Sequence, residues 1–305
     1  MRDSWHSYFK PGIIHFMAYP ETIKGDGPIL ETLEKIATDD FFTAVEVTWI
    51  NDPKVRKEAA DLLAASQLEV AFGSQPMFLT TKLDLNALDS SERAKAVEQL
   101  KKGIDQAQEL GAKRLAFLSG WDPGPEKRSE ATECLFESIV EACGYAKEKG
   151  ISLTMETFDR DVDKKCLMGP NTECVAFAKR IREAGFPDFG LTVDLSHFPL
   201  QFEATRDALH TVKDYLVHAH MGNCVLKKDS PAYGDSHPRF SLPDGEIGVE
   251  ELAEYFRGLF EIGFLAEGKK ELPIISFEVK PLPGEKSEIV IANAKRTLTL
   301  AWSLV

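Results

Sequence analysis

Eight short apolar runs alternate with longer amphipathic stretches from one end of the 305 residues to the other. Short apolar runs bounded by turn residues predict buried strands, and the amphipathic stretches predict helices long enough for parallel crossovers. Eight such units predict an α/β fold of the closed (β/α)8 (TIM) barrel type. An open doubly wound sheet is disfavoured, because no glycine-rich phosphate loop follows the first run. The predicted strands are Gly12–Met17, Ala44–Trp49, Leu68–Gly73, Arg114–Leu118, Ser152–Glu156, Gly190–Asp194, Leu216–His220 and Ile274–Glu278.

Helix start and stop signals separate these runs. Asp52 precedes a proline, Asp89-Ser-Ser-Glu92 resembles a capping box, and Asn171 follows Pro170, so each is expected to cap a helix. No linker or shift in composition divides the chain, and we therefore expect a single domain over residues 1–305. Glycines that fit helix ends are Gly111, Gly150, Gly185 and Gly263.

Composition limits the partners. Lys and Arg number 36 and Asp and Glu 49, which gives a net charge of 36 − 49 = −13 and disfavours nucleic acid as a partner. The segment Met1–Gly12 has no apolar stretch of signal-peptide length, and no run is long enough to span a bilayer. We therefore predict a cytoplasmic protein with no membrane partner. The five cysteines contain no CxxC pair and are predicted to be reduced, structural thiols.

Carboxylates stand at the ends of three predicted strands. Glu156 ends the fifth strand, Asp194 the sixth and Glu278 the eighth, while the seventh strand carries His218 and His220 on one face. The C-terminal ends of barrel strands meet at one mouth, where these carboxylates would repel one another without a cation. Oxygen ligands with one imidazole suit Mn, Mg, Co or Zn. The sequence thus predicts one divalent metal ion.

Two further groups join the same mouth. His197 lies three residues beyond Asp194, and the loop after the seventh strand holds the pair Asp235-x-His237. Both side chains of this pair can face one way, so His197, Asp235 and His237 are candidates for the same site.

The order of the motifs resembles that of the xylose isomerase-like superfamily. The motifs are Glu156, Asp194-x-x-His197, His220, Asp235-x-His237 and Ser276-Phe-Glu278. This superfamily contains sugar-phosphate isomerases and epimerases as well as endonuclease IV. The resemblance extends over the whole barrel and is densest from Glu156 onward. It implies that Glu156, Asp194, His220 and Glu278 bind one divalent metal. Two roles remain open for His197, Asp235 and His237, which either form a second metal site, as the resemblance to endonuclease IV implies, or hydrogen-bond substrate hydroxyls.

Some residues of this chain differ from the pattern of the relatives, and these differences limit the activities that the resemblance implies. The three-zinc cluster of endonuclease IV also needs histidines from the third and fourth strands, whereas Gln75 and Ser119 stand near those positions here. A nuclease is therefore only a remote alternative. Ketose 3-epimerases share the four metal ligands, but their loop after the seventh strand carries Glu and Arg, and this chain has Met221-Gly-Asn-Cys224 instead.

The resemblance implies a sugar, or sugar-phosphate, isomerase or epimerase that acts on a small polyhydroxylated carbonyl compound. In the family, two glutamates move the proton through an enediolate, and these map to Glu156 and Glu278. Alternatives on the same barrel are a metal-dependent lyase, either an inosose-type dehydratase or a β-keto sugar-acid decarboxylase, and a sugar-binding barrel without catalysis. Barrels of this family commonly pair, so a homo-oligomer, as a dimer or tetramer, is expected.

Weaker substrate-binding candidates stand near other strand ends. Lys280 follows Glu278 by two residues, and Arg160 or Lys164 could reach over the mouth from the charged loop after the fifth strand. The remaining candidates are His15, Glu46, Gln75 and Trp121.

Overall fold

The computed structural model of the chain describes residues 4–305, so Met1, Arg2 and Asp3 of the segment Met1–Gly12 lie outside the described residues. Eight parallel strands form one sheet in the order β1-β8-β7-β6-β5-β4-β3-β2, and a bridge between Ile14 and Glu46 joins its two edges. The predicted (β/α)8 barrel is therefore confirmed. The strands are β1 Lys10–Ile13, β2 Ala44–Val47, β3 Glu69–Gly73, β4 Arg114–Phe117, β5 Ser152–Glu156, β6 Gly190–Asp194, β7 Leu216–Gly222 and β8 Ile274–Glu278.

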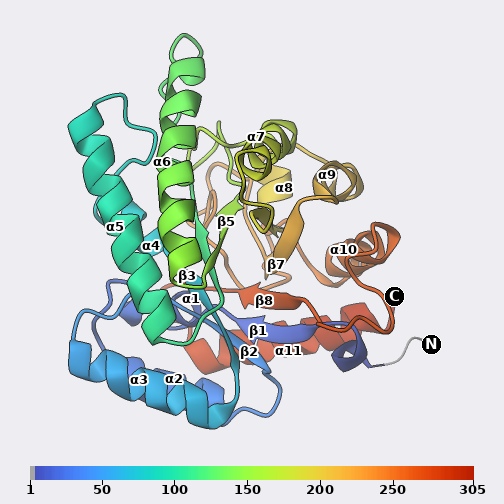
Figure 1. Cartoon of the computed structure of the whole chain (residues 1–305). Helices are drawn as coiled ribbons and strands as arrows, with labels where there is room; N and C mark the ends of the chain where they lie inside the picture. The colour runs from blue at the N-terminus through green and yellow to red at the C-terminus, as the bar shows by residue number, and fades with distance from the viewer. Residues whose placement is uncertain (1–3) are drawn as a thin grey trace.

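Helices connect the strands and surround the barrel (Figure 1). The long crossover helices are α2 Ile29–Ala37, α3 Pro53–Ser66, α5 Ser90–Glu109, α6 Arg128–Glu148, α7 Asn171–Glu183, α9 Thr205–Val212, α10 Val249–Glu261 and α11 Ser287–Trp302. Shorter helical turns follow several strand ends: α1 His15–Ala18 with η2 Pro20–Thr22, α4 Gln75–Leu79 and α8 His197–Leu200. A further turn, η1 Trp5–Ser7, precedes β1.

The predicted caps agree with the structure in two of three cases. Asp52 accepts hydrogen bonds from two backbone N–H groups of α3, and Asp89 does the same for α5. The predicted cap at Asn171 is wrong. Pro170 occupies that position, and the N–H of Asn171 donates to the distant Glu203 carboxylate, so a tertiary contact replaces the local one. The four predicted stop glycines all have positive φ, between 72° and 104°.

The first strand differs most from its predicted bounds of Gly12–Met17. It begins at Lys10 and ends at Ile13, because its register pairs Lys10 with Ile274 and Ile13 with Phe277. The chain then turns into α1, which begins at His15. A short apolar run does not by itself distinguish strand from helix, and here the pairing with β8 decides where the strand ends.

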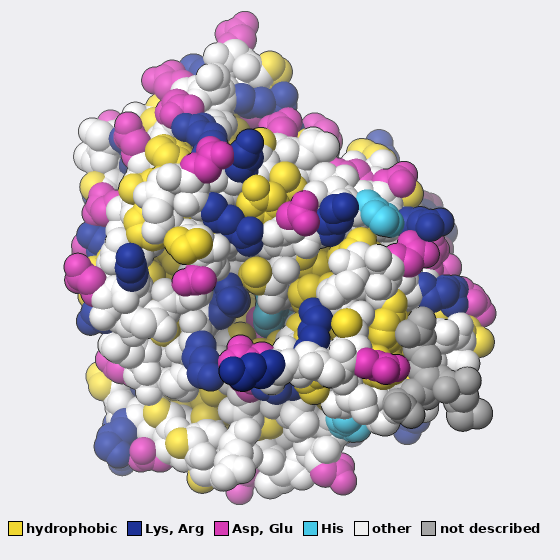
Figure 2. Space-filling model, turned by 45° about the vertical axis from the view of Figure 1, so that its right-hand side comes forward, with side chains coloured by type: hydrophobic (Ala, Val, Ile, Leu, Met, Phe, Trp, Pro, Cys, Tyr) yellow, Lys and Arg dark blue, Asp and Glu magenta, His cyan; other side chains and the backbone are white. Residues whose placement is uncertain are grey.

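No helix within residues 4–305 is long and apolar enough to cross a membrane. Acidic and basic side chains are interspersed over the face shown in Figure 2, where a histidine is visible at the floor of a central hollow. All five cysteines are free thiols, and four of them are buried.

Candidate metal centre at the barrel mouth

The four predicted metal ligands lie at the C-terminal ends of four consecutive strands. Glu156 ends β5, Asp194 ends β6, His220 lies on β7, and Glu278 ends β8. All four side chains are buried, at 0–8% exposure. Except for Asp194, they line a cavity of about 200 Å³. The structure thus brings together residues that are up to 122 positions apart in the sequence (278 − 156).

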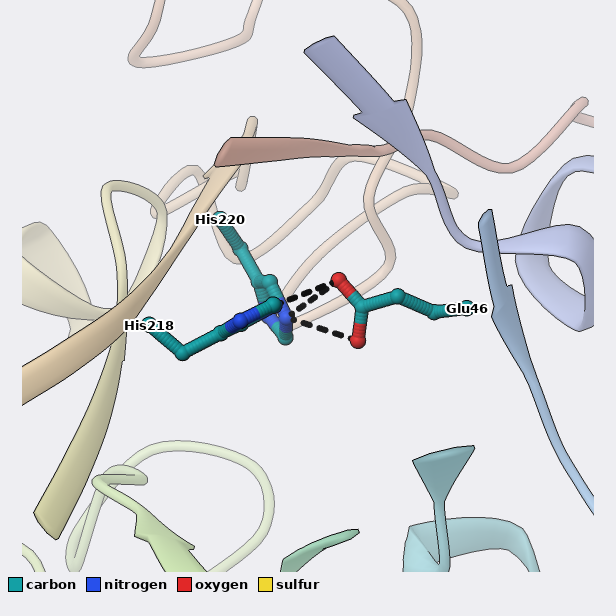
Figure 3. Close-up of side chains that lie close together, drawn as sticks. All are labelled: Glu46, His218 and His220. Atoms are coloured by element: carbon teal, nitrogen blue, oxygen red, sulfur yellow. Dashed lines mark hydrogen bonds and ion pairs between the residues drawn. The ribbon is translucent and has the colours of Figure 1, made fainter. Parts of the chain in front are cut away.

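His220 is the centre of this group. Its Nδ1 lies 2.9 Å from Glu278 Oε2 and 3.2 Å from Glu156 Oε1, so both glutamates face the same ring nitrogen. The opposite nitrogen, Nε2, lies 3.2 Å from Glu46 Oε1 (Figure 3). An imidazole held by a carboxylate at one nitrogen presents the other to a metal, which is the usual arrangement of a histidine ligand.

Glu46 also holds a second imidazole. His218, two residues before His220 on β7, places Nε2 2.7 Å from Glu46 Oε1, as Figure 3 shows. Burial opposes the charged form of Glu46, but His218 and His220 outweigh it and hold its pKa well below the ordinary value. Glu46 is therefore a buried anion that orients His220 from the far side of the barrel.

Asp194 has room in the group because a glycine on β7, two residues beyond its register partner His220, lies next to it. A Cβ on Gly222 would stand 2.7 Å from Asp194 Oδ1 and 2.8 Å from His237 Nδ1, so only glycine leaves room for both side chains. The backbone N–H of Ser196 donates to Asp194 Oδ1 at 2.5 Å. Asp194 Oδ2 is buried and has no hydrogen-bond partner within residues 4–305.

These observations fit a divalent metal ion. Ligand atoms of Glu156, His220 and Glu278 lie within 4.8 Å of one another, as do those of Asp194, His237 and Glu278, and Glu278 joins the two groups. Asp194 Oδ2 is buried without a hydrogen-bond partner among the described residues, a costly arrangement unless a cation neutralises it. Burial, and then repulsion from Glu156, raise the pKa of Glu278 to about 7 against the opposing histidines.

His197, Asp235 and His237 form a second group beside the first. Asp235 Oδ1 lies 3.0 Å from His237 Nε2 and 3.3 Å from His197 Nε2. His197 Nδ1 lies 2.7 Å from the carbonyl oxygen of Thr157 and therefore donates to it, which directs Nε2 toward Asp235. Burial lowers the pKa values of both histidines, but the nearby carboxylates, Asp235 foremost, outweigh it and raise them to about 10 for His197 and about 9 for His237.

The weaker candidates fall into two sets. Glu46, Gln75 and Lys280 line the cavity. Gln75, at the start of α4, donates from Nε2 to Glu156 Oε2 at 2.5 Å and so orients a predicted catalytic carboxylate. The backbone N–H of Lys280 donates to the carbonyl oxygen of His237, which ties the end of β8 to the second group.

His15, Trp121 and Arg160 do not line the cavity. His15 is buried in α1, where its Nε2 lies 2.7 Å from Thr32 Oγ1, and burial lowers its pKa to about 3. Trp121 is 37% exposed. Arg160 donates to both carboxylate oxygens of Glu173 in the first turn of α7, at 2.9 and 2.6 Å, and this pairing holds it away from the cavity.

Sequence reasoning missed the apolar wall of the cavity. Phe16 of α1 and Phe158, two residues beyond Glu156, line it, and neither was among the predicted site residues. The position of Phe158 on the same side as Glu156 is the signal that could have identified it. A larger hollow of about 630 Å³ lies at the opposite end of the barrel, around the first residues of the strands. None of the four predicted ligands lines that hollow.

Comparisons with known proteins agree with the fold. A sequence profile described as the xylose isomerase-like TIM barrel matches residues 35–281. Similar solved structures include an L-ribulose 3-epimerase (TM-score 0.73, 18% identity, 97% of this chain and 95% of that one) and a D-tagatose 3-epimerase-like protein (TM-score 0.72, 19% identity, 96% and 98%). A third is the IOLI protein with a zinc atom bound (TM-score 0.70, 14% identity, 97% and 99%).

No match was found among curated proteins. At these low identities the solved structures establish the fold alone, whereas the profile covers most of the sequence. The chain therefore belongs to the family of xylose isomerase-like TIM barrels.

Proposed function

We propose that this protein is a divalent-metal-dependent isomerase or epimerase that acts on a small sugar or sugar phosphate. The observation that carries the proposal is the pair Glu156 and Glu278, two buried carboxylates that face the same nitrogen of His220 at the barrel mouth. A site that only bound a sugar would not need two ionisable groups at one nitrogen of a single histidine. The epimerases among the similar structures agree with this reaction class.

Glu156, Asp194, His220 and Glu278 would hold the metal, one ion of Mn, Mg, Co or Zn. When bound, the ion polarises the substrate carbonyl and stabilises the negative charge that develops on its oxygen. The donor set of three carboxylates and one imidazole suits these hard or borderline ions.

The two glutamates carry the proton. One removes it from the carbon beside the carbonyl and leaves an enediolate, and the other returns it. Return to the opposite face of the same carbon is epimerisation. Return to the neighbouring carbon is isomerisation, in which the proton of the adjacent hydroxyl also passes to the former carbonyl oxygen. Gln75 holds Glu156 in place, and the raised pKa of Glu278 suits a group that accepts and gives a proton near neutral pH. Phe16 and Phe158 keep water from one side of the cavity.

The substrate's hydroxyls have nearby polar partners. His237 and Lys280 line the cavity, and Lys280 suits a substrate carboxylate or phosphate. The cytoplasmic location and the homo-oligomer remain predictions.

NMR in D₂O tests the reaction class. Metal-loaded protein is incubated with a panel of ketoses, inososes and keto acids, and deuterium entry at the carbon beside the carbonyl is followed. Entry without loss of water or CO₂ supports an isomerase or epimerase. Loss of either product would identify the lyase, and no exchange with any compound would contradict the proposal.

Glu156→Gln and Glu278→Gln test the residue assignment. Each should slow deuterium entry by at least about 100-fold, since general acid–base groups contribute about 10²–10⁴-fold. Glu69→Gln is the matched control, because Glu69 lies at the N-terminal end of β3 and pairs with Lys10. If both site variants exchange at the wild-type rate, the two glutamates are not the proton carriers.

A further inference from the structure

The second group at the mouth already contains a cation. The Lys164 ammonium lies 2.9 Å from Asp235 Oδ2, and donates to the Asp235 carbonyl oxygen at 3.1 Å and to Asp163 Oδ2 at 2.8 Å. An ammonium has three N–H donors, and three acceptors surround this one. Lys164 is therefore fully engaged.

The loop that carries Lys164 is held in one conformation by hydrogen bonds to its own backbone. The buried carboxylate of Asp159 accepts hydrogen bonds from the backbone N–H groups of Val162, Asp163 and Lys164, at 2.8–2.9 Å. The facing loop fits closely, because a Cβ on Gly234, which has φ +94°, would stand 2.9 Å from Asp163 Cγ. The backbone of both loops thus fixes where the ammonium lies.

Neither carboxylate oxygen of Asp235 accepts a hydrogen bond within residues 4–305, but both lie close to basic groups. Oδ2 faces the ammonium, and Oδ1 lies between the imidazoles of His197 and His237. A divalent ion on these three side chains would stand a few ångströms from the ammonium, in a buried site where like charges repel strongly. The donor set itself suits a metal, since its ligand atoms lie within 4.8 Å of one another.

We propose that the Lys164 ammonium takes the place of a second metal ion at His197, Asp235 and His237, so that this chain binds one divalent ion at the mouth. The inference deepens the proposed function by assigning the number of ions. It leaves His197 and His237 as hydrogen-bonding groups, and of these His237 lines the cavity. Removal of the ammonium should turn the same three side chains into a metal site, because His197 is already oriented for one by Thr157.

Metal stoichiometry tests the inference. Wild-type protein and Lys164→Ala are stripped with chelator and titrated with Mn²⁺ and Zn²⁺ by calorimetry, and bound metal is counted by mass spectrometry after dialysis. We expect one ion per wild-type chain and two per Lys164→Ala chain. The added site should disappear in Lys164→Ala/His197→Ala.

Two variants serve as controls. Lys165→Ala removes an exposed charge from the same loop and should keep the wild-type count, and Lys164→Arg, which keeps a cation, should do so too. If near-ultraviolet circular dichroism shows that Lys164→Ala is not folded, Lys164→Gln replaces it, because its amide keeps hydrogen-bond donors without the charge.

The possible results separate the two proposals. A wild-type chain that binds no ion contradicts the proposed function, and the gain of a site in Lys164→Ala still decides the role of Lys164. A wild-type chain that binds a second ion at His197, Asp235 and His237, or a Lys164→Ala chain that gains no site, overturns the inference.

Discussion

The two halves of the barrel contribute different things to the mouth. Strands β5 to β8 and the loops that follow them carry the four predicted metal ligands and the second group. Strands β1 to β4 carry none of these, but Glu46 on β2 and Gln75 after β3 reach across the barrel to His220 and Glu156. The difference separates side chains that would contact a metal or substrate from side chains that hold the first set in position.

This division has a physical basis. The three buried carboxylates of the second half repel one another, and this repulsion alone does not select one rotamer for each side chain. Hydrogen bonds from the opposite wall fix the rotamers of Glu156 and His220 before any ligand enters. Substitutions in the second half should therefore abolish function, and substitutions in the first half should weaken it.

The largest expected effect in this comparison is that of Asp194→Asn. The amide removes a negative charge and an anionic oxygen from the donor set, so metal affinity should fall by more than about 100-fold, beyond the loss typical of a supporting residue. Competition with a fluorescent chelator measures the affinity. An affinity equal to that of the wild type would remove Asp194 from the ligand set.

Glu46→Gln should have an intermediate effect. The loss of the anion behind His220 should weaken metal binding by about 10–100-fold, the range known for partners of ligating histidines. Glu69→Gln, in the same half but at the N-terminal end of its strand, should leave affinity unchanged. If Glu46→Gln lowers metal affinity as much as Asp194→Asn does, or does not lower it at all, the proposed difference between the two halves is wrong.

His15→Gln should have the smallest effect, and it should change only the stability of the fold. Its pKa is lowered in the folded state, so the unfolded chain binds more protons between about pH 3 and pH 6.5, and stability falls as pH decreases through this window. From pH 7 to pH 5 we expect a loss of about 1–2 kcal/mol, measured by urea unfolding of the metal-free protein. His15→Gln should lose less over the same interval. An equal loss in both proteins would show that other groups cause it.

Local patterns predicted much of the fold. The eight strands, the helix caps at Asp52 and Asp89, and the stop glycines all depend on neighbouring residues, so they could be inferred from short windows. The placement of Glu156, Asp194, His220 and Glu278 at one mouth followed from strand order, since parallel strands of a barrel share one C-terminal edge. The errors at β1 and at Asn171 both involve partners far away in the sequence.

The site shows the same limit. His15 follows β1 and was predicted to face the mouth, but a turn of helix buries it against Thr32. Arg160 and Lys164 stand four residues apart in one charged loop, and only the packing of that loop against Gly234 and Asp235 shows that Lys164, not Arg160, reaches the site.

The sequence by itself determined the kinds of chemical groups at the mouth and the order in which the strands bring them there, because strand periodicity and strand ends are local properties. Only the tertiary structure decided which group partners which. Contacts such as those of Glu46 with His220 and of Lys164 with Asp235 join residues 174 and 71 positions apart, and their energies depend on distance and burial in three dimensions.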